Sequence, residues 1–356
     1  MYVPVVELTR GRVVESLHFG AIAVMDASGK RLAAAGDAGL VTFLRSSAKP
    51  FQAMPTLESG ALEGLGLSDR EVAIMCASHL GSDAQVEAVS ALLQKAGARE
   101  TDLLCGTHPV GDPRVAERLL RRKKEPTPLR HNCSGKHAGM LAYSRFRWGQ
   151  TRSPAGQSYV DPHNPLQEEI RQTLAQMCGL SDQAVELGID GCSAPNFAVP
   201  LEAAALGMAR LMDPRELPPR RAEACARITR AMTSYPEMIR GAGHFDTEFM
   251  RAGGGGWVAK SGAEGYLLIG VRAGRRGDNP GVGIAIKISD GDRAERKSAV
   301  GEGEARARPI VALETMRQLG LITAAEREAL AAFGPRPIRN WRDIEVGEIR
   351  PAFRLG

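Results

Sequence analysis

Hydrophobic residues are arranged differently at the two ends of this chain and in its middle. Short apolar or β-branched runs bounded by glycine and polar turn residues are typical of β-strands. Such runs lie at 3–8, 20–25, 40–44, 265–271 and 281–288. We therefore predict strands within residues 1–45 and within residues 255–350.

Between about residues 50 and 252 the apolar positions recur at helical spacing, and signals for helix boundaries are frequent. Ser68 and Glu71 match a capping box. Asp112-Pro113 and Pro165 are typical helix starts. The middle of the chain is therefore expected to be mostly helical.

Strands from the two chain ends can pair into one antiparallel sheet, with the helical middle packed beside it. The sequence thus predicts a single domain, residues 1–356, with a mixed α/β (α+β) fold. Its sheet part would be 1–45 and 255–350, and its helical part 50–252. The glycines at 253–256 lack the Lys-Ser/Thr that ends a phosphate-binding loop, and this argues against a nucleotide-binding fold.

Composition narrows the classes of partner. The chain has 356 residues, of which 43% are hydrophobic and 24% charged, as in ordinary globular proteins. Only 5% are aromatic, which argues against a base-stacking nucleic-acid surface. The net charge of +5 owes much to the basic run 121–124, interpreted as a solvated helix end. We expect neither a nucleic-acid partner nor a membrane span, since no apolar stretch approaches the ~20 residues a span requires.

The start of the chain lacks the basic lead and apolar run of a signal peptide. The expected location is therefore the cytoplasm. The six scattered cysteines are expected to be reduced there.

The first candidate for chemistry is the segment from Ser46 to Lys49. Ser-x-x-Lys at the start of a helix places both side chains on one face, one turn apart. A lysine that is partly removed from water loses its proton more easily and can act as base for a serine hydroxyl. The alternative is a capping serine with an exposed lysine.

Two further segments strengthen this interpretation. Lys260-Ser-Gly262 resembles the Lys-Thr-Gly of β-lactamases and penicillin-binding proteins, which also use Ser-x-x-Lys. Ser78 and His79 follow a predicted helix in the middle of the chain, where a second active-site motif would lie. A surface hairpin turn and a structural loop are the respective alternatives.

Two polar loops offer candidate metal ligands. His131-Asn-Cys-Ser-Gly-Lys-His137 and Asp190-Gly-Cys-Ser-Ala-Pro195 together contain two cysteines, two histidines and an aspartate, which suit Zn²⁺. Their spacing is not that of a zinc finger or ribbon, so buried thiols and packed histidines remain an alternative.

Together these segments resemble one family, the bacterial asparaginases of the Rhizobium etli type, also called asparaginase II or class 3. The resemblance runs nearly end to end. It is close at 45–52, 77–79, 131–140, 190–195 and 260–262.

The resemblance implies a serine β-lactamase/glutaminase-like fold, hydrolysis of L-asparagine to L-aspartate and ammonia, and a homodimer. It implies two Ser–Lys pairs, Ser46 with Lys49 and Ser78 with Lys260, with Ser46 as the nucleophile. It further implies that a zinc ion beside the pocket is bound by Cys133, Lys136 and Cys192. Its expected role is in substrate binding rather than chemistry.

Other polar residues in these segments are candidates for substrate binding. Arg45 and Arg240 suit the substrate carboxylate by charge, although each could equally be a structural salt-bridge partner. The remaining candidates are His79, Asn132 and Asp190. Three other functions stay open: a glutaminase, a β-lactam-type hydrolase, or a non-catalytic amino-acid-binding protein on the same fold.

Overall fold

The computed structural model of the protein describes residues 1–275, 277–292 and 305–356. In these residues the main sheet contains the strands β1 (Val3–Arg10), β2 (Val13–Asp26), β3 (Arg31–Ala35), β7 (Trp257–Ser261), β8 (Tyr266–Val271), β9 (Val282–Ile288), β10 (Arg336–Arg339) and β11 (Glu345–Pro351). The strands follow the order β10-β11-β1-β2-β9-β8-β7, and β3 also pairs with β2. All of these pairings are antiparallel.

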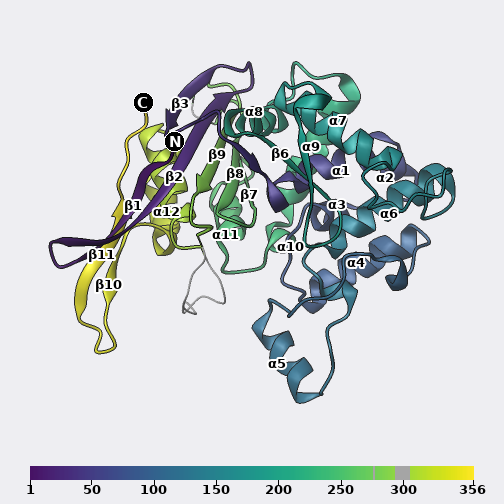
Figure 1. Cartoon of the computed structure of the whole chain (residues 1–356), viewed down its shortest axis with the longest axis horizontal. Coiled ribbons are helices and arrows are strands. Elements are labelled where there is room, and N and C mark those ends of the chain that lie inside the picture. Colours follow the sequence, from purple (N-terminus) through teal and green to yellow (C-terminus); the bar gives the residue numbers. More distant parts are fainter. Residues whose placement is uncertain (276, 293–304) are drawn as a thin grey trace.

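The two ends of the chain meet in this sheet, as predicted. Strand β2 pairs with β9, with Ile22 opposite Ile286, and β1 pairs with β11. Figure 1 shows the purple N-terminal strands beside the green and yellow C-terminal ones. The predicted mixed α/β fold with an antiparallel sheet from both chain ends is therefore confirmed.

Helices cover both faces of the main sheet. The described helices are α1 (Lys49–Glu58), α2 (Ala61–Gly64), α3 (Asp69–Met75), α4 (Asp83–Lys95), α5 (Pro113–Arg121), α6 (Ser134–Trp148), α7 (Pro165–Cys178), α8 (Leu201–Met212), α9 (Pro219–Ser234), α10 (Pro236–Ile239), α11 (Phe245–Ala252), α12 (Arg308–Gln318) and α13 (Ala324–Ala329). Helix α8 packs on β9 and β2 from the helical side, and α12 packs on the other face (Figure 1).

Burial of both faces explains why the strands appear as continuous apolar runs. On β2, Ala21 and Ala23 join the core beneath the helical region, whereas Ile22 and Val24 join the core beneath α12. The main sheet has small residues at the points where α8 packs closest to it. A Cβ atom on Gly283 would stand only 1.8 Å from the Ala205 carbonyl oxygen.

Several local predictions are confirmed in the helical region. The Ser68 hydroxyl accepts from the Glu71 N–H, and the Glu71 carboxylate caps Ser68 in return. Asp112 caps α5, and Pro165 opens α7 after its cap, Asn164. These signals are reliable because the groups that satisfy a helix end lie within a few residues of it.

The middle of the chain is mostly helical, as predicted, but it also contains two strands that the sequence did not reveal. Strands β5 (Glu186–Ile189) and β6 (Pro195–Pro200) form a second, three-stranded sheet with β4 (Val41–Phe43). The predicted run 40–44 therefore leaves the main sheet, and Phe43 pairs with Ala198. An apolar run indicates a strand, but it does not identify a partner that is distant in sequence.

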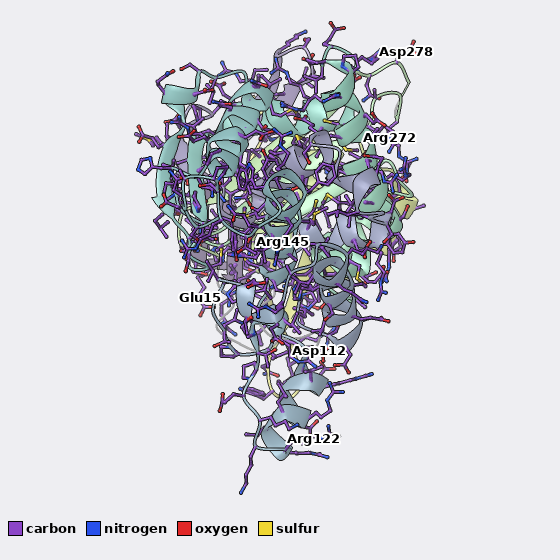
Figure 2. The ribbon with its side chains drawn as sticks, turned by 90° about the vertical axis from the view of Figure 1, so that its right-hand side faces the viewer. Glu15, Asp112, Arg122, Arg145, Arg272 and Asp278 are labelled. Atoms are coloured by element: carbon purple, nitrogen blue, oxygen red, sulfur yellow. The ribbon has the colours of Figure 1, made fainter. Side chains whose placement is uncertain are left out.

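Helix α5 lies on an arm that projects from the helical region (Figure 1). In Figure 2, Asp112 lies where the helix begins and Arg122 lies toward the far end of the arm. The basic run 121–124 is exposed at the C-terminal end of α5, so its interpretation as a solvated helix end is confirmed. Within the described ranges, no helix is both long and apolar enough to cross a lipid bilayer.

Candidate active site

Ser46 and Lys49 lie where the chain turns from β4 into α1. A 3₁₀ turn, Arg45–Ala48, connects the two elements, and Pro50 supports the first turn of α1. Ser46 is partly exposed, whereas Lys49 is only 1% exposed. The turn therefore places the hydroxyl at the surface of a pocket and the amine beneath it.

Two buried lysines converge on the hydroxyl of Ser78. Lys49 Nζ donates to Ser78 Oγ over 2.9 Å, and Lys260 Nζ donates to the same oxygen over 3.0 Å. Lys260 comes from β7, which the sequence did not predict as a strand, rather than from a turn. The structure thus brings together a helix start, a loop and a strand from distant parts of the chain.

Main-chain carbonyls hold each lysine in this arrangement. Lys49 also donates to Ala77 O over 2.6 Å and to Asn132 O over 3.2 Å. Lys260 also donates to Ser261 O over 2.6 Å. Among the described contacts, no hydrogen bond joins Lys49 directly to Ser46.

Burial makes both amines easier to deprotonate than lysines in water. It lowers the pKa of Lys49, and the nearby positive charge of Lys136 also lowers it, while the Cys133 sulfur opposes the shift. Burial lowers the pKa of Lys260 to about 7, despite the opposing attraction of Asp246. Lys260 can therefore exchange a proton near neutral pH.

Ser46 and Ser78 line the same pocket, which has a volume of about 240 Å³. Its other polar lining residues are Asn132, Arg240, His244, Asp246, Ser261 and Arg308. A pocket of this size and polarity suits a small polar metabolite rather than a large apolar ligand.

Of the residues predicted to bind substrate, Arg240 and Asn132 line this pocket. Arg240 Nη1 donates to Ser78 O over 3.2 Å. Arg45 lies outside the lining set and donates through Nε to Asp190 over 2.8 Å.

His79 is also outside the lining residues and is 1% exposed. Its Nδ1 accepts from the Gly81 N–H over 3.1 Å, and Nε2 lies 2.9 Å from Ser134 Oγ. Burial lowers the pKa of His79 to about 3, so the ring is neutral. These contacts place His79 beneath the site, where it fixes neighbouring loops.

The predicted metal ligands form a second, adjacent cluster. The ligand atoms of Cys133, Asp190 and Cys192 all lie within 4.8 Å of one another. Lys136 Nζ donates to Cys192 Sγ over 3.1 Å. Two sulfurs, one amine and one carboxylate oxygen in a buried space are a donor set that suits zinc.

One sulfur of this cluster, that of Cys133, loses its proton easily. A hydrogen bond from Cys192, together with the nearby lysines, lowers the pKa of the Cys133 thiol well below its ordinary value. Burial alone would lower the pKa of Lys136, but the neighbouring sulfurs outweigh burial and raise it to about 12. Binding of a metal through Lys136 would therefore release a proton.

Sequence reasoning missed four polar lining residues as functional candidates: His244, Asp246, Ser261 and Arg308. Asp246 lies in the first turn of α11, where a carboxylate is ordinary because it favours the helix dipole. Arg308 lies at the start of α12 and donates to Asp292 and Gly262 O. Ser261 lies within the Lys260-Ser-Gly262 segment already singled out, whereas Asp246 and Arg308 are brought to the pocket only by the fold.

Residues 6–351 of the chain match the family model described as L-asparaginase II. A comparison with curated proteins finds no match. This match to the family covers nearly the whole chain and includes all the candidate site residues named above.

Among solved structures, the chain is similar to the Bacillus subtilis glutaminase YbgJ in covalent complex with 5-oxo-L-norleucine. The identity is 15%, with 85% of this chain and 88% of that chain covered and a TM-score of 0.38. It is also similar to Mglu in its native form at 4.3 M NaCl. There the identity is 17%, with 86% of this chain and 62% of that chain covered and a TM-score of 0.44.

Proposed function

Because the chain belongs to the L-asparaginase II family of amidohydrolases, we propose that it hydrolyses L-asparagine to L-aspartate and ammonia, as a Rhizobium etli-type enzyme. The observation that carries this proposal is the convergence of Lys49 and Lys260 on Ser78 Oγ in one pocket with Ser46. Burying two amines so close together is unfavourable. A protein that only binds an amino acid has no need of them, and this supports an enzyme over a sensor.

In the proposed mechanism Ser46 is the nucleophile. Its oxygen bonds to the side-chain amide carbon while the carbonyl electron pair moves to oxygen. The Ser46 proton passes to Ser78 Oγ, and the Ser78 proton passes to neutral Lys260, whose amine is 3.0 Å away. Main-chain N–H groups near Ser46 stabilise the oxyanion, which is worth about 3–4 kcal/mol per donor.

Collapse of the tetrahedral intermediate breaks the carbon–nitrogen bond. The leaving nitrogen takes the proton back from Lys260 through Ser78 and departs as ammonia. Water then attacks the β-aspartyl ester, gives its proton to the same relay, and releases aspartate and the Ser46 hydroxyl. Lys49 stays an ammonium throughout, since it donates to Ser78 and to two carbonyl oxygens.

Arg240 is the proposed partner of the substrate carboxylate. It lines the pocket, and a guanidinium has five N–H donors, so its bond to Ser78 O leaves donors for a carboxylate. Arg45 is proposed to act indirectly by holding Asp190 in place.

Zinc would be held by Cys133, Lys136 and Cys192, with the Asp190 carboxylate beside them. When bound, the ion would supply a fixed positive charge that orders the loops around it. Asn132 precedes Cys133 and lines the pocket, and its carbonyl oxygen accepts a hydrogen bond from Lys49. An ion that orders this loop would therefore also hold Asn132 and Lys49 in place.

The test is ammonia release from asparagine, glutamine and a chromogenic β-lactam. We expect turnover of asparagine, and Ser46→Ala should lower kcat by roughly 10⁴-fold or more. The diazoketone analogue of asparagine, 5-diazo-4-oxo-L-norvaline, should alkylate Ser46, as judged by peptide mass spectrometry. Full activity of Ser46→Ala, or a label on Ser78 instead, would overturn this mechanism.

A further inference from the structure

Lys260 lies between Ser78 and a carboxylate to which the proposed mechanism gives no role. Asp246 is 2% exposed, and its Oδ2 atom is 4.0 Å from Lys260 Nζ. This separation is longer than a hydrogen bond but short enough for strong attraction between charges in a buried site. The carboxylate therefore acts on the lysine through its charge.

Ser261, the residue after Lys260, clamps this carboxylate. Its backbone N–H donates to Asp246 Oδ2 over 2.8 Å, and its hydroxyl donates to Oδ1 over 2.5 Å. Both carboxylate oxygens are thereby fixed. Strand β7 carries the clamp and the lysine together, so one strand and the start of α11 determine the geometry.

Charged and titratable groups surround Lys260, and they come from several elements of the fold. They are Asp246 on α11, Lys49 on α1, Arg240 after α10, Cys133 before α6 and Cys76 after α3. Burial, Lys49 and Arg240 disfavour the ammonium form of Lys260, whereas Asp246 favours it. Asp246 is the carboxylate in this group, and its removal would leave the positive neighbours largely unopposed.

Resting on the function proposed above, we propose that Asp246 is a positioning residue for Lys260. Clamped by Ser261, it holds the lysine beside Ser78 and governs how readily the amine keeps the proton received during attack. The Ser261 bonds temper the carboxylate charge, and the 4.0 Å gap prevents a tight ion pair that would keep the lysine permanently charged.

The test is Asp246→Asn, which removes the charge and keeps the shape. The acidic limb of the kcat/KM profile should move to lower pH by about one unit, because an opposite charge at this distance shifts a pKa by at least that much. The plateau at high pH should fall roughly threefold to tenfold, since the amine becomes a weaker base. The control is Asp213→Asn, which changes a buried carboxylate paired with Arg215. It should leave the pH of the acidic limb of the kcat/KM profile unchanged.

A second readout does not need turnover. In ¹³C-lysine-labelled protein, the Lys260 resonance is assigned by its loss in Lys260→Met, and its titration midpoint should move down in Asp246→Asn. If the wild type released no ammonia from asparagine, the proposed function would fail, while this midpoint would still decide the role of Asp246.

An unchanged midpoint and an unchanged acidic limb in Asp246→Asn would overturn the proposal. If that variant does not fold, Asp246→Ser removes the same charge and leaves room for a water molecule. Failure of both variants to fold would also overturn it, because Asp246 would then be required for the fold itself.

Discussion

At the scale of single residues, the site depends on amines that are removed from water. Lys260 is fully buried, and burial lowers its pKa to about 7. A lysine in water would be protonated at neutral pH and could accept nothing. Burial therefore allows this residue to accept a proton near neutral pH, and its amine lies 3.0 Å from the Ser78 oxygen, its proton donor in the proposed mechanism.

This predicts a specific pH dependence. Only neutral Lys260 accepts a proton, so kcat/KM should be low at pH 5.5, rise tenfold per unit below pH 7, and level off above about pH 8. Initial rates of ammonia release between pH 5.5 and 9 measure the profile. A flat profile between pH 6 and 8 would contradict a base with a pKa near 7.

At the scale of elements, the sequence predicted what is encoded locally. Capping residues such as Ser68 and Asp112 marked helix starts correctly because their partners lie within one turn. The serine–lysine segments were found because their spacing is itself a signal. Asp246 was missed because its partner Ser261 lies on a different element. Strand β4 was assigned to the wrong sheet for the same reason.

The contact between α8 and β9 gives a prediction about stability. Gly283→Ala would place a Cβ 1.8 Å from the Ala205 carbonyl oxygen, so α8 would have to move away from the sheet. We expect a loss of about 1–3 kcal/mol in the free energy of unfolding, as for other overpacked cores. Urea unfolding followed by circular dichroism measures it.

The matched control is Gly39→Ala. Gly39 is exposed, and its nearest neighbour would be 3.4 Å from the added atom, so its stability should change by less than about 0.5 kcal/mol. Equal stabilities of the two variants would mean that α8 does not limit the packing of β9.

At the scale of the whole molecule, the thiol cluster connects two loops that are distant in sequence. Cys133 precedes α6, and Cys192 precedes β6. If zinc occupies this cluster as proposed, its removal with a chelator should raise KM roughly tenfold with kcat changed less than threefold, because the role proposed for the ion is to order the pocket without entering the chemistry. The melting temperature should also fall, and added zinc should restore both.

Metal content provides the control for this prediction. Cys192→Ser should lose bound zinc, whereas Cys225→Ala, at a buried cysteine outside the cluster, should retain it. A large loss of kcat on chelation would instead assign the ion a direct part in the reaction.

The meeting of the chain ends in one sheet has a consequence for synthesis on the ribosome. A nascent chain that has emerged only as far as α11 contains Ser46, Lys49 and Ser78 but not β7, which carries Lys260. Strand β2 meanwhile lacks its partner β9, and an unpaired strand edge invites association with other chains. Amide hydrolysis can therefore begin only after β7 has left the ribosome, and the chain most needs protection from aggregation before β9 has paired with β2.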